Sequence, residues 1–296
     1  MENKKIFLAY FGLTILISLA LYSGVNIFKK QPQQAKKETA QLAVLPVLDQ
    51  KKVWGEPVKT MFPDITNPKY VDAKAAGQFV KDEDDVLVLN VKNNTYVYPI
   101  SIMSFHHIVN DTIDKEPVVI TYCLLADAAV AFRRSLDGKT LELGVLGPLY
   151  SGDLIMYDKK NDSYILQVTG QMFKGANKGK ILTQYTSLER KKWKEVKGQK
   201  NLQILPPVQK MAFYRDFFEK RKNATVGINS LTTKGIPLDP RLPELTKGIG
   251  IVNEDSVSFV ALDKVDQNRD KIQASQLSTQ VYWYVWSGLY PQTTVL

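Results

Sequence analysis

The side chains with the most reactive chemistry in this chain are concentrated between Tyr98 and Asp158. This segment holds both histidines, His106 and His107, and the only cysteine, Cys123. Imidazole and thiolate are common nucleophiles, proton carriers and metal ligands. If the chain has a reactive or metal-binding site, these residues are the first candidates for it.

Two kinds of chemistry fit these residues. A thiol nucleophile would need His106 within hydrogen-bond reach of Cys123. A site for a single metal ion could draw on the two histidines and the thiol, completed by a carboxylate such as Asp111 or Asp127. Adjacent histidines on one short turn diverge, however, so His106 and His107 are not expected to bind the same ion. The competing interpretation is structural, with a buried cysteine and hydrogen-bonded histidines in the core.

Charge and cysteine content exclude several classes of protein. The net charge of +9 is uneven, because residues 1–52 hold eight lysines against three acidic residues. The remaining surplus is small and dispersed, which argues against a nucleic-acid-binding face. Attraction of the leader to anionic lipid headgroups explains the surplus more simply. A single cysteine excludes an internal disulfide framework and a zinc site built from several thiolates.

The N-terminus predicts a membrane anchor. After a short tail at residues 1–5, residues 6–28 read IFLAYFGLTILISLALYSGVNIF without a charge. As a helix this segment would be about 35 Å long, enough to cross a bilayer. A cleaved signal peptide ending near Ser18-Leu19-Ala20 competes, but the apolar run continues past that point. Residues 29–52, rich in Lys, Gln, Ala and Pro, are predicted to be a flexible tether.

The side of the membrane stays open on these residues. Lysines follow the apolar segment more densely than they precede it, which favours a cytoplasmic body. Long domains nevertheless translocate despite their charge, so a periplasmic body is equally compatible with the pattern.

Residues 53–296 are predicted to form one mainly β domain of antiparallel strands with a few short helices. Short β-branched runs separated by turn residues carry this prediction. The predicted strands are Val86–Val91, Val118–Tyr122, Ala129–Arg134, Thr140–Val145 and Asp153–Asp158, and the predicted helices are Pro99–His106, Ser187–Val196 and Gln209–Lys222. A weak internal repeat relates residues 86–103 to residues 249–265, each read as two strands around a polar turn.

Two segments stand out by composition. The C-terminal stretch is dense in aromatic residues, among them Trp283, Trp286 and Tyr290, and would either cover the core or face a partner. The run Arg190, Lys191, Lys192, Trp193 is expected on a helix face, either solvated or in contact with lipid headgroups or an acidic partner.

Several motifs in order resemble a known family. They are YP…FHHIVND, TYCLLADAAVAF, GPLYSGDLIMYD, Gln167 with Gly170, DPRLP and the final W…YP.T. Together they resemble the prokaryotic family catalogued as domain of unknown function 3179, over about Val80 to the C-terminus. The resemblance implies an exported or envelope protein, hence a bacterial inner-membrane protein with a periplasmic body. It brings no biochemical activity with it.

The chain departs from this family at the residues of interest. His106 matches the family histidine, but His107 stands where the family usually has Glu. Cys123 matches the first cysteine of a Cys-x-x-Cys-like motif, and Ala126 replaces the second. A single thiol lacks the resolving partner that dithiol exchange requires.

The leading hypothesis is a membrane-anchored envelope protein without catalytic activity. Its β-rich domain would bind a protein partner or form an accessory subunit of a membrane complex, with no cofactor and no nucleic acid. The alternative is a metal-binding or thiol-dependent enzyme centred on His106 and Cys123. A third reading is a ligand-binding module between the two halves of the repeat.

Overall fold

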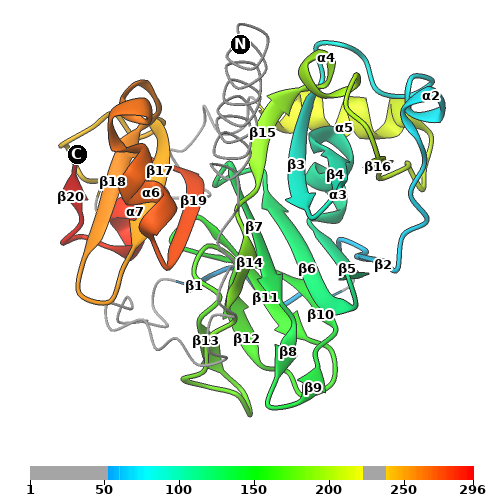
Figure 1. Ribbon diagram of the computed structural model, residues 1–296. Helices are drawn as coiled ribbons and strands as arrows, with labels where there is room; N and C mark the ends of the chain where they lie inside the picture. The colour runs from blue at the N-terminus through cyan, green and yellow to red at the C-terminus, as the bar shows by residue number, and fades with distance from the viewer. Residues whose placement is uncertain (1–52, 60, 223–237) are drawn as a thin grey trace, which may run out of the picture. The chain divides into compact units, whose positions relative to one another are not determined.

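The computed structural model describes residues 53–59, 61–222 and 238–296, all of which belong to one compact unit at residues 39–296. The predicted tail, anchor and tether lie outside the described residues. Within those residues, no helix combines the length and apolar character needed to span a bilayer. The described chain is β-rich, with mostly antiparallel sheets and few short helices, as predicted (Figure 1).

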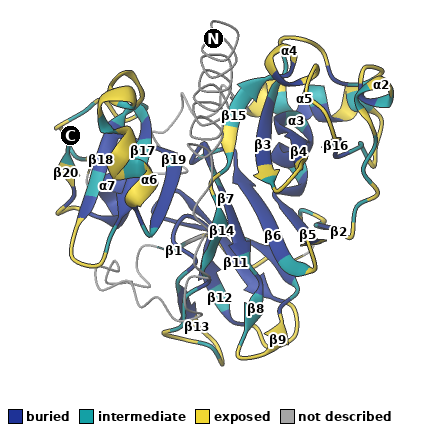
Figure 2. Cartoon of the chain, viewed as in Figure 1, coloured by how far each residue is buried: buried dark blue, intermediate teal, exposed yellow. Residues whose placement is uncertain are grey.

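Two five-stranded sheets supply much of the largest hydrophobic cluster. Their strands are mostly buried, and the loops between them are mostly exposed (Figure 2). The first sheet has the order β1 (Val53–Trp54), β10 (Leu143–Tyr150), β11 (Asp153–Asp158), β12 (Tyr164–Leu166), β13 (Met172–Lys174). The second has the order β14 (Gln184–Thr186), β7 (Ala128–Arg133), β6 (Glu116–Cys123), β5 (Ile108–Ile113), β2 (Ile65–Thr66). A short hairpin joins β8 (Ser135–Leu136) to β9 (Lys139–Thr140).

Strand β6 is buried on both faces, which explains its nearly continuous apolar sequence. Successive side chains of a strand point to opposite faces of the sheet. Val119 and Cys123 belong to the largest hydrophobic cluster, whereas Val118, Ile120 and Tyr122 belong to a second cluster built with the short helix α3 (Ile100–His106). Cys123 therefore lies on the face of the sheet that turns away from α3.

Two further sheets of four strands share one topology. The first repeat has the order β15 (Glu189–Lys192), β3 (Asp85–Val91), β4 (Asn94–Pro99), β16 (Leu202–Ile204). The second repeat has the order β19 (Leu277–Tyr282), β17 (Lys247–Val252), β18 (Val257–Ala261), β20 (Thr294–Val295). In both, an antiparallel hairpin is flanked by an antiparallel strand on one edge and a parallel strand on the other.

The register of the two repeats corresponds residue by residue. At the start of each hairpin, Lys192 pairs with Asp85 in the first repeat and Tyr282 pairs with Lys247 in the second. The next residue is a tryptophan in both repeats. Its backbone N–H donates to a backbone oxygen, from Trp193 to Asp84 and from Trp283 to Thr246, both at 2.9 Å. The segments that suggested a repeat in the sequence thus form equivalent hairpins, and the flanking strands extend the equivalence well beyond them.

Short helices close these sheets. The helix α3 ends where His107 takes a left-handed conformation, φ 59°, and its N–H donates to the oxygen of Met103 at 2.8 Å. Helix α5 packs against α3 through the second hydrophobic cluster. The remaining bounds are α2 (Ala73–Ala76), α4 (Trp193–Val196), α5 (Met211–Lys222), α6 (Arg269–Ala274) and α7 (Trp283–Leu289), with 3₁₀ turns at Leu262–Lys264 and Asp266–Asn268.

One predicted helix is wrong and two are confirmed, the first of them being the helix at residues 99–106, which is α3. Residues 187–196 were expected to be helical, but Glu189–Lys192 form strand β15 and only Trp193–Val196 form a helical turn. Pairing with the free edge of β3 overrides the weak helical pattern of this short, charged segment. The predicted amphipathic helix at residues 209–222 is confirmed as α5.

Candidate functional site at the repeat junction

The best-defined polar cluster in the described residues surrounds Asp127, in the turn between β6 and β7. The turn places Asp127 in a left-handed conformation, φ 48°, which aspartate tolerates better than most residues. Only 4% of its side chain is exposed. A carboxylate buried to this degree needs charged or hydrogen-bonding partners, and both are present.

Four donors surround the Asp127 carboxylate. The Oδ1 atom accepts from the Tyr122 hydroxyl at 2.9 Å and from Nη1 of Arg190 at 2.5 Å. The Oδ2 atom accepts from Nε2 of Gln280 at 3.2 Å and lies 2.7 Å from Nζ of Lys247. These residues come from β6, β15, β19 and β17, so one side chain joins the second five-stranded sheet to both repeats.

Arg190 extends the network into the first repeat, because its Nη2 donates to Asp85 at 2.9 Å. Burial opposes the charge of the Arg190 guanidinium, but the carboxylates of Asp127 and Asp85 outweigh burial and raise its pKa. Burial raises the pKa of Tyr122 well above the usual range. Arg190 therefore stays cationic, and Tyr122 stays a neutral donor.

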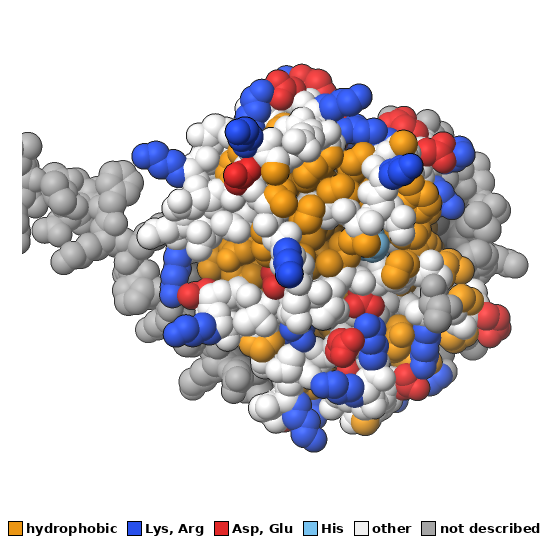
Figure 3. Space-filling view, turned by 90° about the vertical axis from the view of Figure 1, so that its right-hand side faces the viewer, with side chains coloured by type: hydrophobic (Ala, Val, Ile, Leu, Met, Phe, Trp, Pro, Cys, Tyr) orange, Lys and Arg blue, Asp and Glu red, His pale blue; other side chains and the backbone are white. Residues whose placement is uncertain are grey.

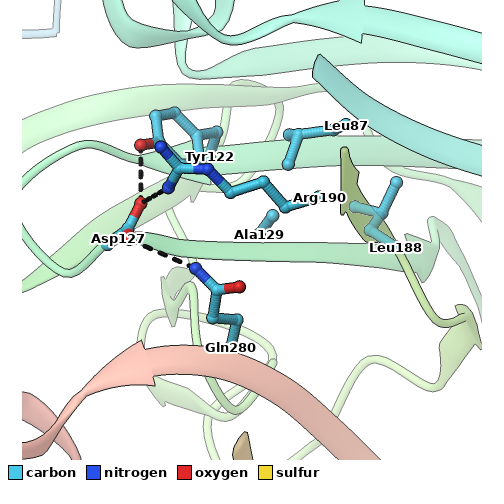
Figure 4. A pocket seen from close by; sticks show the side chains of 7 residues that line it. All are labelled: Leu87, Tyr122, Asp127, Ala129, Leu188, Arg190 and Gln280. Atoms are coloured by element: carbon cyan, nitrogen blue, oxygen red, sulfur yellow. Dashed lines mark hydrogen bonds and ion pairs between the residues drawn. The ribbon is translucent and has the colours of Figure 1, made fainter. Parts of the chain in front are cut away.

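Arg190 and Gln280 occupy equivalent positions in the two repeats. Arg190 pairs with Leu87 and Gln280 pairs with Ile249, and each stands three residues before the tryptophan that begins the following helix. Figure 4 shows the two side chains reaching Asp127 from different strands. Asp127 thus lies where equivalent strands of the two repeats meet.

A small pocket lies beside this cluster. Its apolar walls are Leu87, Ala129 and Leu188, and Tyr122, Asp127, Arg190 and Gln280 supply its polar side (Figure 4). The volume of the pocket that the centre of a water molecule can occupy is about 10 Å³. That volume holds about one water molecule and no larger ligand.

Cys123 lies away from this pocket and is chemically protected. It is 2% exposed, and its Sγ accepts a hydrogen bond from the N–H of Ala126 at 3.5 Å. Burial, together with the nearby carboxylate of Asp153, raises the pKa of the thiol to about 12. The thiolate is the reactive form of cysteine, so this thiol is not suited to nucleophilic chemistry near neutral pH.

Asp153 is fully buried at the start of β11. Its Oδ1 accepts from the N–H of Leu154 at 2.8 Å and its Oδ2 accepts from the N–H of Val168 at 2.9 Å. Burial raises the pKa of this carboxyl to about 7, although the backbone donors favour the charged form. No arginine or lysine side chain bonds to it among the described residues.

His106 does not form the catalytic pair that the sequence allowed. Its Nδ1 is 2.6 Å from the oxygen of Pro63, and its Nε2 is 2.8 Å from the hydroxyl of Tyr214. Because the N–H of Gln209 donates to that hydroxyl, we assign the Tyr214 O–H as the donor to Nε2 and the Nδ1–H as the donor to Pro63. Burial lowers the pKa of His106. Both ring nitrogens are therefore occupied, and Cys123 lies on the other face of β6.

The metal-site residues do not converge either. The Nδ1 of His107 donates to the oxygen of Tyr122 at 2.8 Å, and burial lowers the pKa of His107 to about 4. Asp111 accepts from the Tyr70 hydroxyl at 2.5 Å, and burial raises its pKa. Across the described ranges, no group of three or more His, Cys, Asp or Glu side chains could hold a metal ion.

The aromatic C-terminus packs in the core, which was one of its two predicted roles, and its other predicted role as a partner surface is wrong. Trp283, Trp286 and Tyr290 are all 0% exposed and belong to the largest hydrophobic cluster. The indole N–H of Trp283 donates to the oxygen of Asp239 at 3.0 Å, and that of Trp286 donates to Oγ1 of Thr293 at 2.9 Å. Such pairing is what burial of an indole requires.

The basic run at residues 190–193 is also not a solvated helix face. Arg190 is held by Asp127, Lys191 pairs with Glu189, and Lys192 pairs with Asp85. Trp193 is 2% exposed and packs into a third small cluster. The alternation of β15 therefore turns part of this run inward.

An apolar surface that the sequence did not indicate surrounds the C-terminal end of α3. Its aromatic rings touch edge to face, with centroids 4.8 Å apart for Phe105 and Phe213 and 6.2 Å apart for Phe62 and Phe105. We call it the aromatic patch: its rings are Phe62, Phe105, Phe213 and Phe217, and we group with them the exposed Met61 and Val208, which lie next to Phe62 and shortly before α5 in the chain. Figure 3 shows hydrophobic side chains gathered on this face, with side chains of both charges around them.

Comparison with known families now adds to this geometry. The model of the family described as "Protein of unknown function (DUF3179)" matches residues 59–288. The chain belongs to this family. The match spans the first repeat, three of the four strands of the second repeat, the Asp127 junction and the aromatic patch. Neither the curated proteins nor the solved structures compared with the chain gave a match.

Proposed function

We propose that the chain is a membrane-anchored envelope protein whose β-rich body has no catalytic activity and binds a protein partner at the membrane. The anchor would be residues 6–28 and the tether residues 29–52, with the body on the periplasmic side of the bacterial inner membrane. The uncharged length of residues 6–28 and the lysines at both ends support the anchor.

One observation carries the non-catalytic part of the proposal. The candidate residues that the structure describes are used by the fold: both nitrogens of His106 have internal partners, the thiol of Cys123 is buried with a pKa of about 12, and Asp127 is ion-paired. Catalytic groups need pKa values near the working pH and access to substrate. Asp153 has a pKa of about 7 but is fully buried and has no access to substrate, so the described body fits a binding role.

Affinity purification of the full chain from native membranes tests this proposal. We expect a membrane protein to co-purify in constant ratio with the wild-type chain and with the Cys123→Ala and His106→Gln variants. The His106 variant must first be shown to fold, by circular dichroism. A chain that elutes alone from cross-linked membranes contradicts the proposal. Loss of the partner in the Cys123→Ala variant would favour the thiol-dependent alternative.

A second candidate function is a ligand-binding module, because the pocket at Asp127 lies between the two repeats. In the structure the pocket holds about one water, so a ligand would have to displace Arg190 from Asp127. A small anion that competes for the guanidinium would then raise the unfolding midpoint of the wild-type chain. The Arg190→Ala variant should lose that response.

A further inference from the structure

The aromatic patch has an exposed side that no described element covers. Val208 is 65% exposed, Met61 50% and Phe213 43%, which places them among the most exposed large hydrophobic residues of the described chain. Phe105 and Phe217 are less exposed, and their rings contact those of Phe213 and Phe62. Large apolar side chains exposed around a cluster of touching rings are typical of an interaction site.

The helix α5 gives the patch a defined direction. Phe213 and Phe217 are one turn apart and in contact, with ring centroids 6.4 Å apart. Lys210 precedes this row and Arg221 follows it at helical spacing, and both side chains are exposed. The guanidinium of Arg221 lies 3.7 Å from the ring centroid of Phe217. The row is therefore apolar in the middle and basic at both ends.

The basic side chains beside the patch differ from the other basic side chains of this segment in their ion pairing. The segment at residues 209–222 carries five basic and two acidic residues. Arg215 is committed to Asp84, and Lys220 pairs with Asp216. No ion pair of Lys210 or Arg221 is seen within the described residues. Aromatic side chains flanked by unpaired cations match the interfacial region of an anionic bilayer, where rings enter the acyl boundary and cations meet the headgroups.

We infer that the aromatic patch docks the body onto the headgroup region of the bilayer that anchors the chain. This inference rests on the membrane anchor in the proposed function. The predicted tether, residues 29–52, would reach about 80 Å if fully extended. As a flexible coil it would hold the body within about 30 Å of the membrane.

Tethering makes a small patch sufficient. A surface held this close to the bilayer meets it at an effective concentration in the millimolar range, so docking needs only a weak intrinsic affinity. The same patch on a free domain would bind vesicles poorly, because one helix face and two cations give a marginal anchor. Docking would also fix which face of the body is offered to a partner in the same membrane.

Two exposed positions with the same accessibility allow a matched experiment. Phe213 and Leu262 are both 43% exposed, but Leu262 lies in the 3₁₀ turn that follows β18, in the second repeat. We would label full-length Phe213→Cys and Leu262→Cys chains with an NBD fluorophore, with Val208→Cys as a second reporter in the patch. Wild-type chain treated identically gives the background from Cys123, which is buried.

The labelled chains are reconstituted into phosphatidylcholine vesicles with and without phosphatidylglycerol. At positions 213 and 208 we expect blue-shifted emission and quenching by nitroxide-labelled lipid, stronger with phosphatidylglycerol and weaker at high salt. At position 262 we expect the emission of a solvent-exposed probe in both vesicles.

Flotation of the vesicles reports the anchor separately. A chain that floats while all three probes stay solvent-exposed overturns patch docking and leaves the proposed anchor intact. A chain that does not float overturns both. A blue shift at position 213 that appears in detergent and grows with protein concentration would show a second copy of the chain on the patch, and would overturn the lipid assignment.

Discussion

Arg190 and Gln280 stand at the same register in two sheets of the same topology, and they donate to opposite oxygens of Asp127. A carboxylate suits this position because its two oxygens can serve two repeats at once. The two repeats have the same strand register but differ in the charges that they place at Asp127. The second cation at the carboxylate is Lys247, which occupies the position that Asp85 holds in the first repeat.

Replacing Asp127 should weaken the whole body. The Asp127→Asn change leaves Arg190 and Lys247 facing a neutral amide, and removing one partner of a buried ion pair costs about 3–5 kcal/mol. Urea unfolding followed by circular dichroism measures this loss. The matched control is Asp137→Asn, whose pair with Lys180 is exposed and should contribute about 0–1 kcal/mol. Equal losses in the two variants would contradict the role of Asp127 as a junction.

Asp153 should make stability fall as pH rises. Its pKa is about 7 in the folded chain against 3.8 ordinarily, so the folded state binds more protons than the unfolded state between these values. Folding is therefore favoured at the acidic end, and up to about 4 kcal/mol is lost between pH 4 and pH 7. Relative to the wild type, Asp153→Asn should become more stable with each step from pH 4 to pH 7 in urea titrations.

His107 supplies the opposite control. Its pKa falls from 6.5 to about 4 on folding, so its contribution to stability is present above pH 6.5 and is lost as pH falls towards 4. A His107→Asn variant keeps a residue that tolerates the left-handed conformation and should lose less stability on acidification than the wild type. Parallel profiles of stability against pH for both variants and the wild type would show that folding does not change the pKa of either group.

The thiol of Cys123 should be silent in the native chain. With a pKa of about 12 and 2% exposure, it offers almost no accessible thiolate at pH 8. We expect no reaction with Ellman's reagent in buffer and one thiol per chain after unfolding in urea. Rapid modification of the native chain would restore the thiol-dependent alternative.

A glycine in the second repeat is expected to tolerate no side chain. A Cβ at Gly250 would lie 2.3 Å from ring atoms of Trp286, whereas the equivalent position in the first repeat is Val88. Gly250→Ala should therefore cost about 1–3 kcal/mol through overpacking. Gly198→Ala is the control, because no atom lies within 4 Å of the added carbon. Thermal unfolding of the two variants compares them, and equal midpoints would contradict the packing argument.

The strands were largely visible in the sequence because burial leaves a pattern. The predicted strand at residues 153–158 has the bounds of β11, and the polar turn of the first hairpin is Lys92-Asn93. The helix at residues 209–222 was visible because Tyr214 and Phe217 repeat at helical spacing and both are buried. The spacing of apolar residues was enough to predict these two elements because each packs against the hydrophobic core.

The site was not visible because its parts are distant in sequence. Asp127 lies 63 residues from Arg190 and 153 from Gln280, and from the sequence it was only one candidate carboxylate for a metal ion. The flanking strands β15 and β19 share only the tryptophan that follows them, so the repeat seemed no longer than its hairpins. Trp283 and Trp286 are close in sequence, but the density of aromatic residues does not show whether they face the core or a partner, so both alternatives stayed open.

The two repeats differ in how the chain closes them. In the second repeat, all four strands lie within residues 247–295. In the first, Val88 pairs with Glu189 across about a hundred residues, and both five-stranded sheets gain strands inside that interval. Long loops must be ordered before such a pair contributes, which slows folding. The second repeat can therefore assemble locally, whereas the first waits for most of the body, and Asp127 can bind both only as a late step in folding.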